Sequence, residues 1–175
     1  MTLIAEGAAV HTGANPALVR AAQRGDPMAL GELMELLLPY IGRICGPIAL
    51  QDGADAAQEA MIKILRSIGE LREPAALFGW ARVIAVREAV RFARGGPAQA
   101  ADLAGLSAAG DPQLSVDIAD TLARLSPEHR AVLVLRDLEG LNEMEASQIL
   151  AIQPGTVRSR LFRARVSFRK AWRDD

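Results

Sequence analysis

Apolar residues recur every three or four positions through most of this 175-residue chain, a spacing that predicts amphipathic α-helices. The first strong stripe follows Asp26 and Pro27, a favourable cap and first residue for a helix. We expect Pro39 to kink or interrupt that helix and Gly46-Pro47 to end it. Similar stripes predict two further helices in the N-terminal half, at about 57–68 and 75–94.

A different pattern separates these helices from those near the C-terminus. Residues 95–115 contain four Gly, two Pro and few charges, with no sustained amphipathic period. We interpret 95–116 as a flexible linker. The predicted organisation is a flexible tail at 1–15, a helical domain at 16–94, the linker, and a second helical domain at 117–175. The predicted fold class is therefore all-α, with two small helical domains joined by a flexible linker.

Capping signals divide the C-terminal domain into short helices. Ser126-Pro127 begins one helix and Gly140 ends it, while Asn142 with Glu145 forms a capping box for the next, at about 143–150. A brief turn leads to the last helix, which begins near Pro154. A short helix, a turn and a longer helix make a helix-turn-helix, whose second helix enters the major groove of DNA. Its expected DNA-contacting residues are Gly155, Thr156, Arg158, Ser159, Phe162 and Arg163.

The net charge of -1 hides a strong segregation of charge along the chain. Residues 62–94 hold seven basic and three acidic side chains, and residues 155–175 hold seven and two. Solvated helix faces also carry such charges. Two basic blocks, each beside an acidic one, favour two local nucleic-acid-binding surfaces over a protein that coats nucleic acid with its whole surface.

Composition argues against several other classes of protein. One Cys excludes a disulfide framework, and two distant His add no metal site, so we expect no bound metal. The sequence contains no run of about 18 apolar residues, so it predicts no transmembrane helix. It also contains no recognisable secretory signal, and both observations favour a cytoplasmic protein. Neither a nucleophile motif nor a Gly-rich phosphate loop is present, so we expect neither an enzyme nor a cofactor.

Three motifs stand in the order and spacing of a known family: LSPEHR, EGL before the short helix, and GTVRSRLFRAR. With them, the C-terminal domain resembles the promoter-binding domain (domain 4) of extracytoplasmic-function (ECF) sigma factors of bacterial RNA polymerase. The N-terminal domain resembles domain 2 of the same family through DGADAAQEAMIKIL and FGWARVIA. Departures include Arg87, where Asn is common, and Ala151 in place of the usual turn Gly.

The resemblance implies an alternative sigma factor that directs promoter-specific initiation. Domain 2 would read the minus-ten element, and the helix-turn-helix would read the minus-thirty-five element. The implied partners are promoter DNA, an anti-sigma factor and the polymerase core, through the clamp helices of its largest subunit and the flap of the second largest, without membrane insertion. The residues that match the family's core-binding region are Asp52, Asp55, Gln58 and Glu59. Matching its minus-ten and melting region are Arg66, Arg72, Trp80, Arg87, Arg91 and Arg94.

Two other functions are compatible with a helix-turn-helix. One is a polymerase-independent regulator acting as a dimer, for which the chain offers no dedicated dimer segment. The other is an interaction module that mimics a sigma factor, which we would expect to lack the basic recognition helix or to carry a receiver domain. Trp80 also leaves two roles open, because a tryptophan beside Ile84 suits core packing as well as base stacking.

Overall fold

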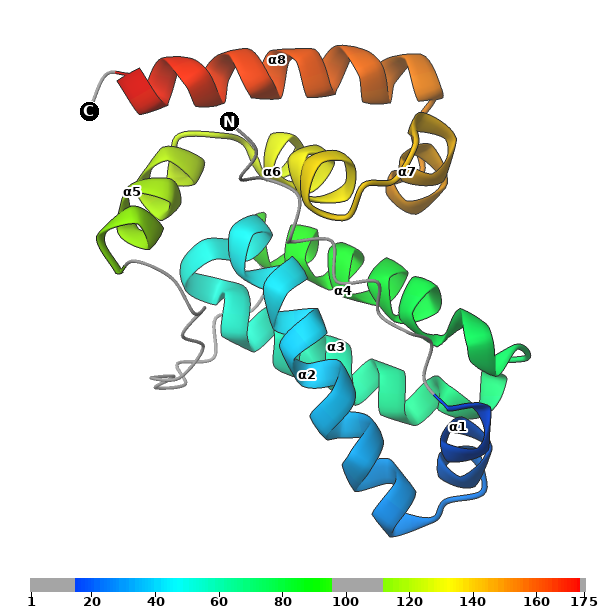
Figure 1. Cartoon of the computed structure of the whole chain (residues 1–175). Helices are drawn as coiled ribbons and strands as arrows, with labels where there is room; N and C mark the ends of the chain where they lie inside the picture. The colour runs from blue at the N-terminus through cyan, green and yellow to red at the C-terminus, as the bar shows by residue number, and fades with distance from the viewer. Residues whose placement is uncertain (1–14, 96–111, 174–175) are drawn as a thin grey trace, which may run out of the picture.

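The computed structural model describes residues 15–95 and 112–173, and every regular element in these two ranges is helical (Figure 1). The predicted all-α fold class is confirmed. The first range is called here the N-terminal half, and it contains α1 (Pro16–Gln23), α2 (Pro27–Ala49), α3 (Gly53–Ser67), α4 (Leu77–Ala93) and three 3-10 turns, η1 (Leu50–Asp52), η2 (Ile68–Glu70) and η3 (Pro74–Ala76). The second range is the C-terminal half, and it contains α5 (Pro112–Ala123), α6 (Pro127–Leu133), the π-helical turn η4 (Val134–Leu138), α7 (Glu143–Leu150) and α8 (Pro154–Arg173).

Two predicted segments fall largely outside the described residues. They are the tail at 1–15 and the linker at 95–116. Helix α5 begins at Pro112, inside the segment predicted as linker. Proline suits the first turn of a helix because its missing N–H would have no partner there.

Helix α2 is longer and less interrupted than its prolines predict. It continues through Pro39 and Pro47 as far as Ala49, so the predicted end at Gly46-Pro47 is wrong. Each proline removes one backbone hydrogen bond, but Leu33, Leu37, Ile41 and Ile44 of α2 are fully buried, and this packing offsets the loss. The helix stops at Leu50, whose φ of 55° leaves the helical region.

The core of the N-terminal half lies between α2, α3 and α4, with α1 packed against α2 (Figure 1). Its apolar stripe along α2 faces Ile64 of α3 and Ala81 and Ala85 of α4, all of them fully buried. Tyr40 meets Phe78 edge to face, with ring centroids 5.1 Å apart. This three-helix core holds α4 in a fixed position on one side of the molecule.

In the C-terminal half, α8 packs along α6 and α7 and forms the outer side of the molecule (Figure 1). The predicted capping box of α7 is present: Asn142 N–H donates to Glu145 Oε2 at 2.7 Å, and Glu145 N–H donates to Asn142 Oδ1 at 3.0 Å. Gly140 ends the preceding segment with a φ of 69°, in the left-handed region that favours glycine. These local signals set the boundaries of the helix-turn-helix.

The two halves pack against each other, with α6 next to α2 and α4 and α7 next to α4. Glu139, just after η4, has a side chain only 3% exposed. It accepts hydrogen bonds of 2.9 Å from each of three N-terminal groups, Tyr40 Oη, Arg43 Nη2 and Arg82 Nε, an arrangement called here the Glu139 contact. Arg130 adds a second link, because its Nε donates to the Ile48 carbonyl at 2.7 Å.

One helical stretch, from Pro27 to Glu70, has the length and apolar composition of a candidate membrane span. Its most apolar window is 44% buried inside the molecule. A core helix of a compact protein has the same properties, so this stretch is weak evidence for a membrane.

Candidate nucleic-acid interface

The N-terminal end of α8 presents the predicted helix-turn-helix residues at the surface. Val157, Leu161 and Ala164 are buried beneath the helix, against the rest of the C-terminal half. Because a helix repeats every 3.6 residues, the positions between them face outward. Phe162 is 66% exposed. The structure thus brings all six predicted residues to one end of α8, with Thr156 half-buried and the others exposed: Gly155, Arg158, Ser159, Phe162 and Arg163.

The turn before α8 depends on an unusual backbone position. Ala151 ends α7 with φ 53° and ψ 45°, the left-handed conformation for which glycine is the usual choice. The next residue, Ile152, donates its N–H to the Ser147 carbonyl at 3.1 Å and packs partly against the core. This short turn directs α8 away from α7.

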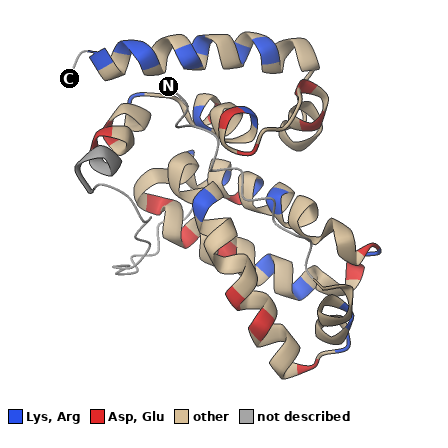
Figure 2. Cartoon of the chain, in the orientation of Figure 1, with Lys and Arg blue, Asp and Glu red and all other residues tan. Residues whose placement is uncertain are grey.

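Helix α8 is strongly basic along its length (Figure 2). Its described residues, 154–173, include seven Lys and Arg and no Asp or Glu. Acidic partners come from neighbouring elements instead. Glu143 of α7 pairs with Arg158, and Asp137 of η4 pairs with Arg165. The hydrogen bond from Arg158 lowers the pKa of Glu143, and the same bond raises the pKa of Arg158.

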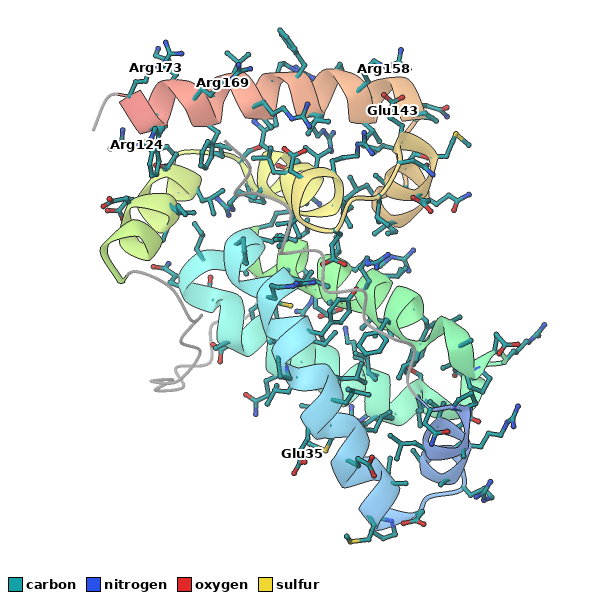
Figure 3. All side chains as sticks on the ribbon, viewed as in Figure 1. Glu35, Arg124, Glu143, Arg158, Arg169 and Arg173 are labelled. Atoms are coloured by element: carbon teal, nitrogen blue, oxygen red, sulfur yellow. The ribbon has the colours of Figure 1, made fainter. Side chains whose placement is uncertain are left out.

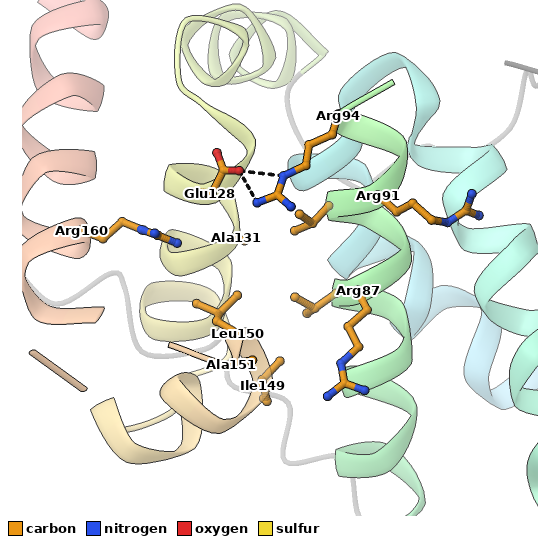
Figure 4. A pocket seen from close by; sticks show the side chains of 11 residues that line it. Arg87, Arg91, Arg94, Glu128, Ala131, Ile149, Leu150, Ala151 and Arg160 are labelled. Atoms are coloured by element: carbon orange, nitrogen blue, oxygen red, sulfur yellow. Dashed lines mark hydrogen bonds and ion pairs between the residues drawn. The ribbon is translucent and has the colours of Figure 1, made fainter. Parts of the chain in front are cut away.

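The basic residues predicted in the N-terminal half do not form a single cluster. Arg66 lies in the last turn of α3, and Arg72 lies in the connection from α3 to α4; both are exposed. Arg87 and Arg91 lie in the second half of α4, and Arg94 directly follows the end of this helix (Figure 4). The structure therefore places these last three at the C-terminal end of α4 and leaves the first two on separate segments.

A groove of about 390 Å³ lies between α4 and the helices α6 and α7 (Figure 4). Its lining combines arginines with apolar residues such as Val90 and Leu150. Arg94 reaches across to Glu128 of α6, with Nε 2.8 Å from Oε1. Arg91 also lines the groove, but the guanidinium end of its side chain points away from α6. Arg91 instead donates to Glu88 on its own helix at 2.8 Å. In this packing, part of the α4 surface faces the C-terminal half.

The connection between α3 and α4 is held by Gln23, a residue that we did not predict as part of any site. Its Nε2 donates to the carbonyls of Ile68 and Leu71, at 2.9 and 2.7 Å. Both of these apolar residues are buried, while Arg72 beside them is exposed. No local signal identifies Gln23, because its partners are 45 and 48 residues away.

Trp80 near the start of α4 is half-buried and packs against the hydrophobic core. This position agrees with core packing and leaves part of the ring at the surface. Core packing is therefore observed for Trp80, and a role in base stacking stays a prediction.

The predicted polymerase-contacting residues occupy η1 and the first half of α3. Asp55, Gln58 and Glu59 lie three and four positions apart, so they share one face of α3. Gln58 is exposed and the two acids are half-buried. Asp52 lies apart from them, lining a second groove between the end of α2 and α5.

Within residues 15–95 and 112–173, no group of three or more His, Cys, Asp and Glu is placed to hold a metal ion. The buried thiol of Cys45 donates to the Ala85 carbonyl, with sulfur and oxygen 3.6 Å apart. Burial raises its pKa to about 12, so it stays protonated near neutral pH. The thiol serves as a small apolar core group.

The chain is similar to several known proteins. A family model described as "Sigma-70, region 4" matches residues 115–167. The chain is 32% identical to the RNA polymerase sigma-H factor of Pseudomonas aeruginosa, over 88% of this chain and 91% of that protein. It is 31% identical to the ECF RNA polymerase sigma-E factor of Haemophilus influenzae, over 85% and 90% of the two chains.

Two solved structures have a similar fold. One is CnrH in complex with the cytosolic domain of CnrY, with a TM-score of 0.65, 21% identity and coverage of 91% of this chain and 97% of that one. The other is the sigma factor RpoE in complex with the anti-sigma factor NepR from Bartonella quintana, with a TM-score of 0.61, 20% identity and coverage of 83% and 97%. At these identities the likeness shows the fold alone.

Proposed function

This chain belongs to the ECF sigma factors of the sigma-70 family, which direct promoter-specific initiation of transcription, and we propose from that premise how its two halves share the task. The C-terminal half reads the minus-thirty-five element with the N-terminal end of α8. The N-terminal half binds the polymerase core and reads and helps to melt the minus-ten element. The chain works by binding in the cytoplasm, and it catalyses no reaction of its own.

The surface of α8 is the observation that carries this proposal. Its apolar face is buried, and its outward residues include two arginines, a serine and an aromatic ring near the N-terminus. Arginine can bind guanine with two parallel hydrogen bonds in the major groove, and hydroxyl groups can reach bases or phosphates. Lys170 and the arginines farther along α8 suit the DNA backbone.

The N-terminal half supports a role with single-stranded DNA. Proteins hold single strands with positive grooves and aromatic surfaces on which bases stack. The exposed Arg66, Arg72 and Arg87, the half-buried Trp80 and the arginines at the end of α4 supply this chemistry. Gln23 keeps the connection beside Arg72 in place for capture of an unstacked base.

Two protein partners complete the proposal. The face of α3 with Asp55, Gln58 and Glu59, together with Asp52, binds the clamp helices of the largest polymerase subunit, since acidic and polar residues suit a basic partner helix. The C-terminal half binds the flap of the second-largest subunit. An anti-sigma factor holds the chain inactive, in line with the complexes of CnrH and RpoE.

Reading both promoter elements requires the two halves to separate. The elements lie about 25 base pairs apart, or about 85 Å along B-DNA. A compact chain of this length is only about 40 Å across. The sixteen residues 96–111 can extend by at most about 55 Å. The packing held by the Glu139 contact therefore belongs to a sigma factor that is not engaged with both elements.

Run-off transcription with purified core polymerase and a genomic DNA library tests the function. We expect discrete transcripts with the wild-type chain. In a binding measurement with the same holoenzyme, Arg158→Ala or Arg163→Ala should weaken binding to the upstream element by about tenfold or more, because a base contact is lost. Arg169→Ala, far from the reading end, is the control and should weaken binding to all sequences alike. Tight promoter binding without core polymerase would instead indicate an independent regulator.

A further inference from the structure

Arg158 differs from the other arginines near the start of α8 in being held by a carboxylate from another helix. Glu143, the first residue of α7, accepts two hydrogen bonds from it (Figure 3). Arg158 Nε lies 3.0 Å from Glu143 Oε1, and Nη2 lies 2.9 Å from Oε2. The Arg158 side chain is 75% exposed, and exposed ion pairs of this kind add little to the stability of a fold. The pair therefore points to a role other than stabilising the fold.

Both ends of this pair are attached to well-fixed backbone. Glu143 follows the capping residue Asn142, and Arg158 follows Val157, which is fully buried. A guanidinium has five N–H donors on a rigid plane. Glu143 uses the edge formed by Nε and Nη2, which leaves the end formed by Nη1 and the second Nη2 hydrogen available. Two donors side by side at that end match O6 and N7 of guanine in the major groove.

The pair also changes what Arg158 gains from DNA. An arginine attracts phosphates through its net positive charge, which supplies most non-specific affinity. A carboxylate within hydrogen-bonding distance compensates that charge but does not block the free end of the guanidinium. The hydrogen bond to Arg158 lowers the pKa of Glu143, so the carboxylate stays ionised near neutral pH.

We propose that Glu143 is a positioning residue that determines specificity: it holds Arg158 in place to read a guanine of the upstream promoter element and disfavours a phosphate contact. This inference rests on the proposed function, in which the N-terminal end of α8 reads that element. Glu143 itself touches no base, and it acts through Arg158.

The chain contains a matched control for this inference. Asp137 of η4 accepts two hydrogen bonds from Arg165, with Nε 3.1 Å from Oδ2. Arg165 lies about two turns beyond Arg158, away from the helix end that contacts bases in a helix-turn-helix. Loss of either carboxylate adds one net positive charge beside α8, but only the loss of Glu143 should change the base preference.

The test uses holoenzyme made from core polymerase and the full chain, bound to duplexes with randomised upstream and downstream elements. For Glu143→Gln, we expect the preference for guanine at one upstream position to fall at least about fivefold. Binding to unselected duplexes should rise at low salt, and the slope of log K against log salt should steepen by about one. Asp137→Asn should raise unselected binding equally and leave every base preference unchanged.

A second variant shows whether Glu143 acts through Arg158. Arg158→Lys keeps the charge but cannot form the two-pronged contact, so it should lose the same guanine preference. Glu143→Gln added to Arg158→Lys should cause no further loss. If Glu143→Gln leaves the preference intact while Arg158→Lys removes it, the inference is overturned and the proposed function stands. If both variants leave all base preferences intact, the assignment of Arg158 as a base reader falls with it.

Discussion

At the scale of single residues, the turn of the helix-turn-helix holds one residue in an unfavourable backbone conformation. Ala151 adopts the left-handed region, with φ 53° and ψ 45°, where a Cβ crowds the backbone. Glycine carries no such penalty. The turn is retained because the residues on either side are anchored, Ile149 by burial and Ile152 by its hydrogen bond to Ser147.

Ala151→Gly should therefore stabilise the protein. We expect the free energy of unfolding to rise by about 0.5–1 kcal/mol, since the relief of backbone crowding exceeds the added freedom of the unfolded chain. Urea denaturation followed by circular dichroism measures this change. Ala146→Gly is the control, because Ala146 is buried inside α7 and glycine there should lower stability by about 1 kcal/mol. A loss of stability in both variants would contradict the left-handed turn.

At the scale of elements, the junction of α2 and α3 depends on the close approach of two backbones. A Cβ built on Gly53 would lie 2.8 Å from the Gly46 Cα, closer than side chains tolerate. Gly53 lies between Asp52 and Asp55, so the contact also sets where α3 presents its predicted polymerase-binding face. Helix packing and the candidate partner surface are thus linked at one position.

Gly53→Ala should push α3 away from α2 and lower the free energy of unfolding by about 1–3 kcal/mol, as overpacking does. Binding of core polymerase should weaken as well, which a pull-down can measure. Gly31→Ala offers a matched comparison in the interior of α2, where an added Cβ meets no atom within 4 Å. It should leave stability unchanged or raise it by up to about 1 kcal/mol. Equal effects of the two variants would argue against the close contact.

At the scale of the whole molecule, the Glu139 contact joins the halves. Removing one partner of a buried ion pair is costly because the remaining charges stay without compensation. The Tyr40 hydroxyl in this contact has its pKa raised to about 12, mainly by burial, so it remains a hydrogen-bond donor near neutral pH. The three donors therefore form a site for one carboxylate, which the C-terminal half supplies.

Glu139→Gln should weaken the packing of the halves by about 3 kcal/mol. Energy transfer between dyes on introduced cysteines in α3 and α8 should fall, because the two halves separate more readily. The native Cys45 is buried, so the dyes react with the introduced cysteines. Glu128→Gln, which removes the partly exposed pair with Arg94, should have a smaller effect because its charges are better solvated. Unchanged transfer efficiency in Glu139→Gln would show that the Glu139 contact does not hold the halves together.

The local elements followed closely from the sequence because their signals act over a few residues. Asn142, Glu145 and Gly140 set helix boundaries through bonds and backbone angles of their own segment. The spacing of Val157 and Leu161 likewise indicated which side of α8 faces outward. Pro39 and Pro47 were exceptions, since burial along α2 outweighed their local cost.

The amino-acid sequence by itself thus determined most of the helices, the helix-turn-helix and the basic character of α8, since spacing and capping are local properties. Helix α1 and the first turn of α5 were not predicted. Only the tertiary structure decided the roles of Gln23, Arg130 and Glu139. Their partners lie 45 to 99 residues away or in the other half of the molecule. A periodic pattern records which side of a helix is buried, but it carries no information on which distant group supplies the matching donor or acceptor.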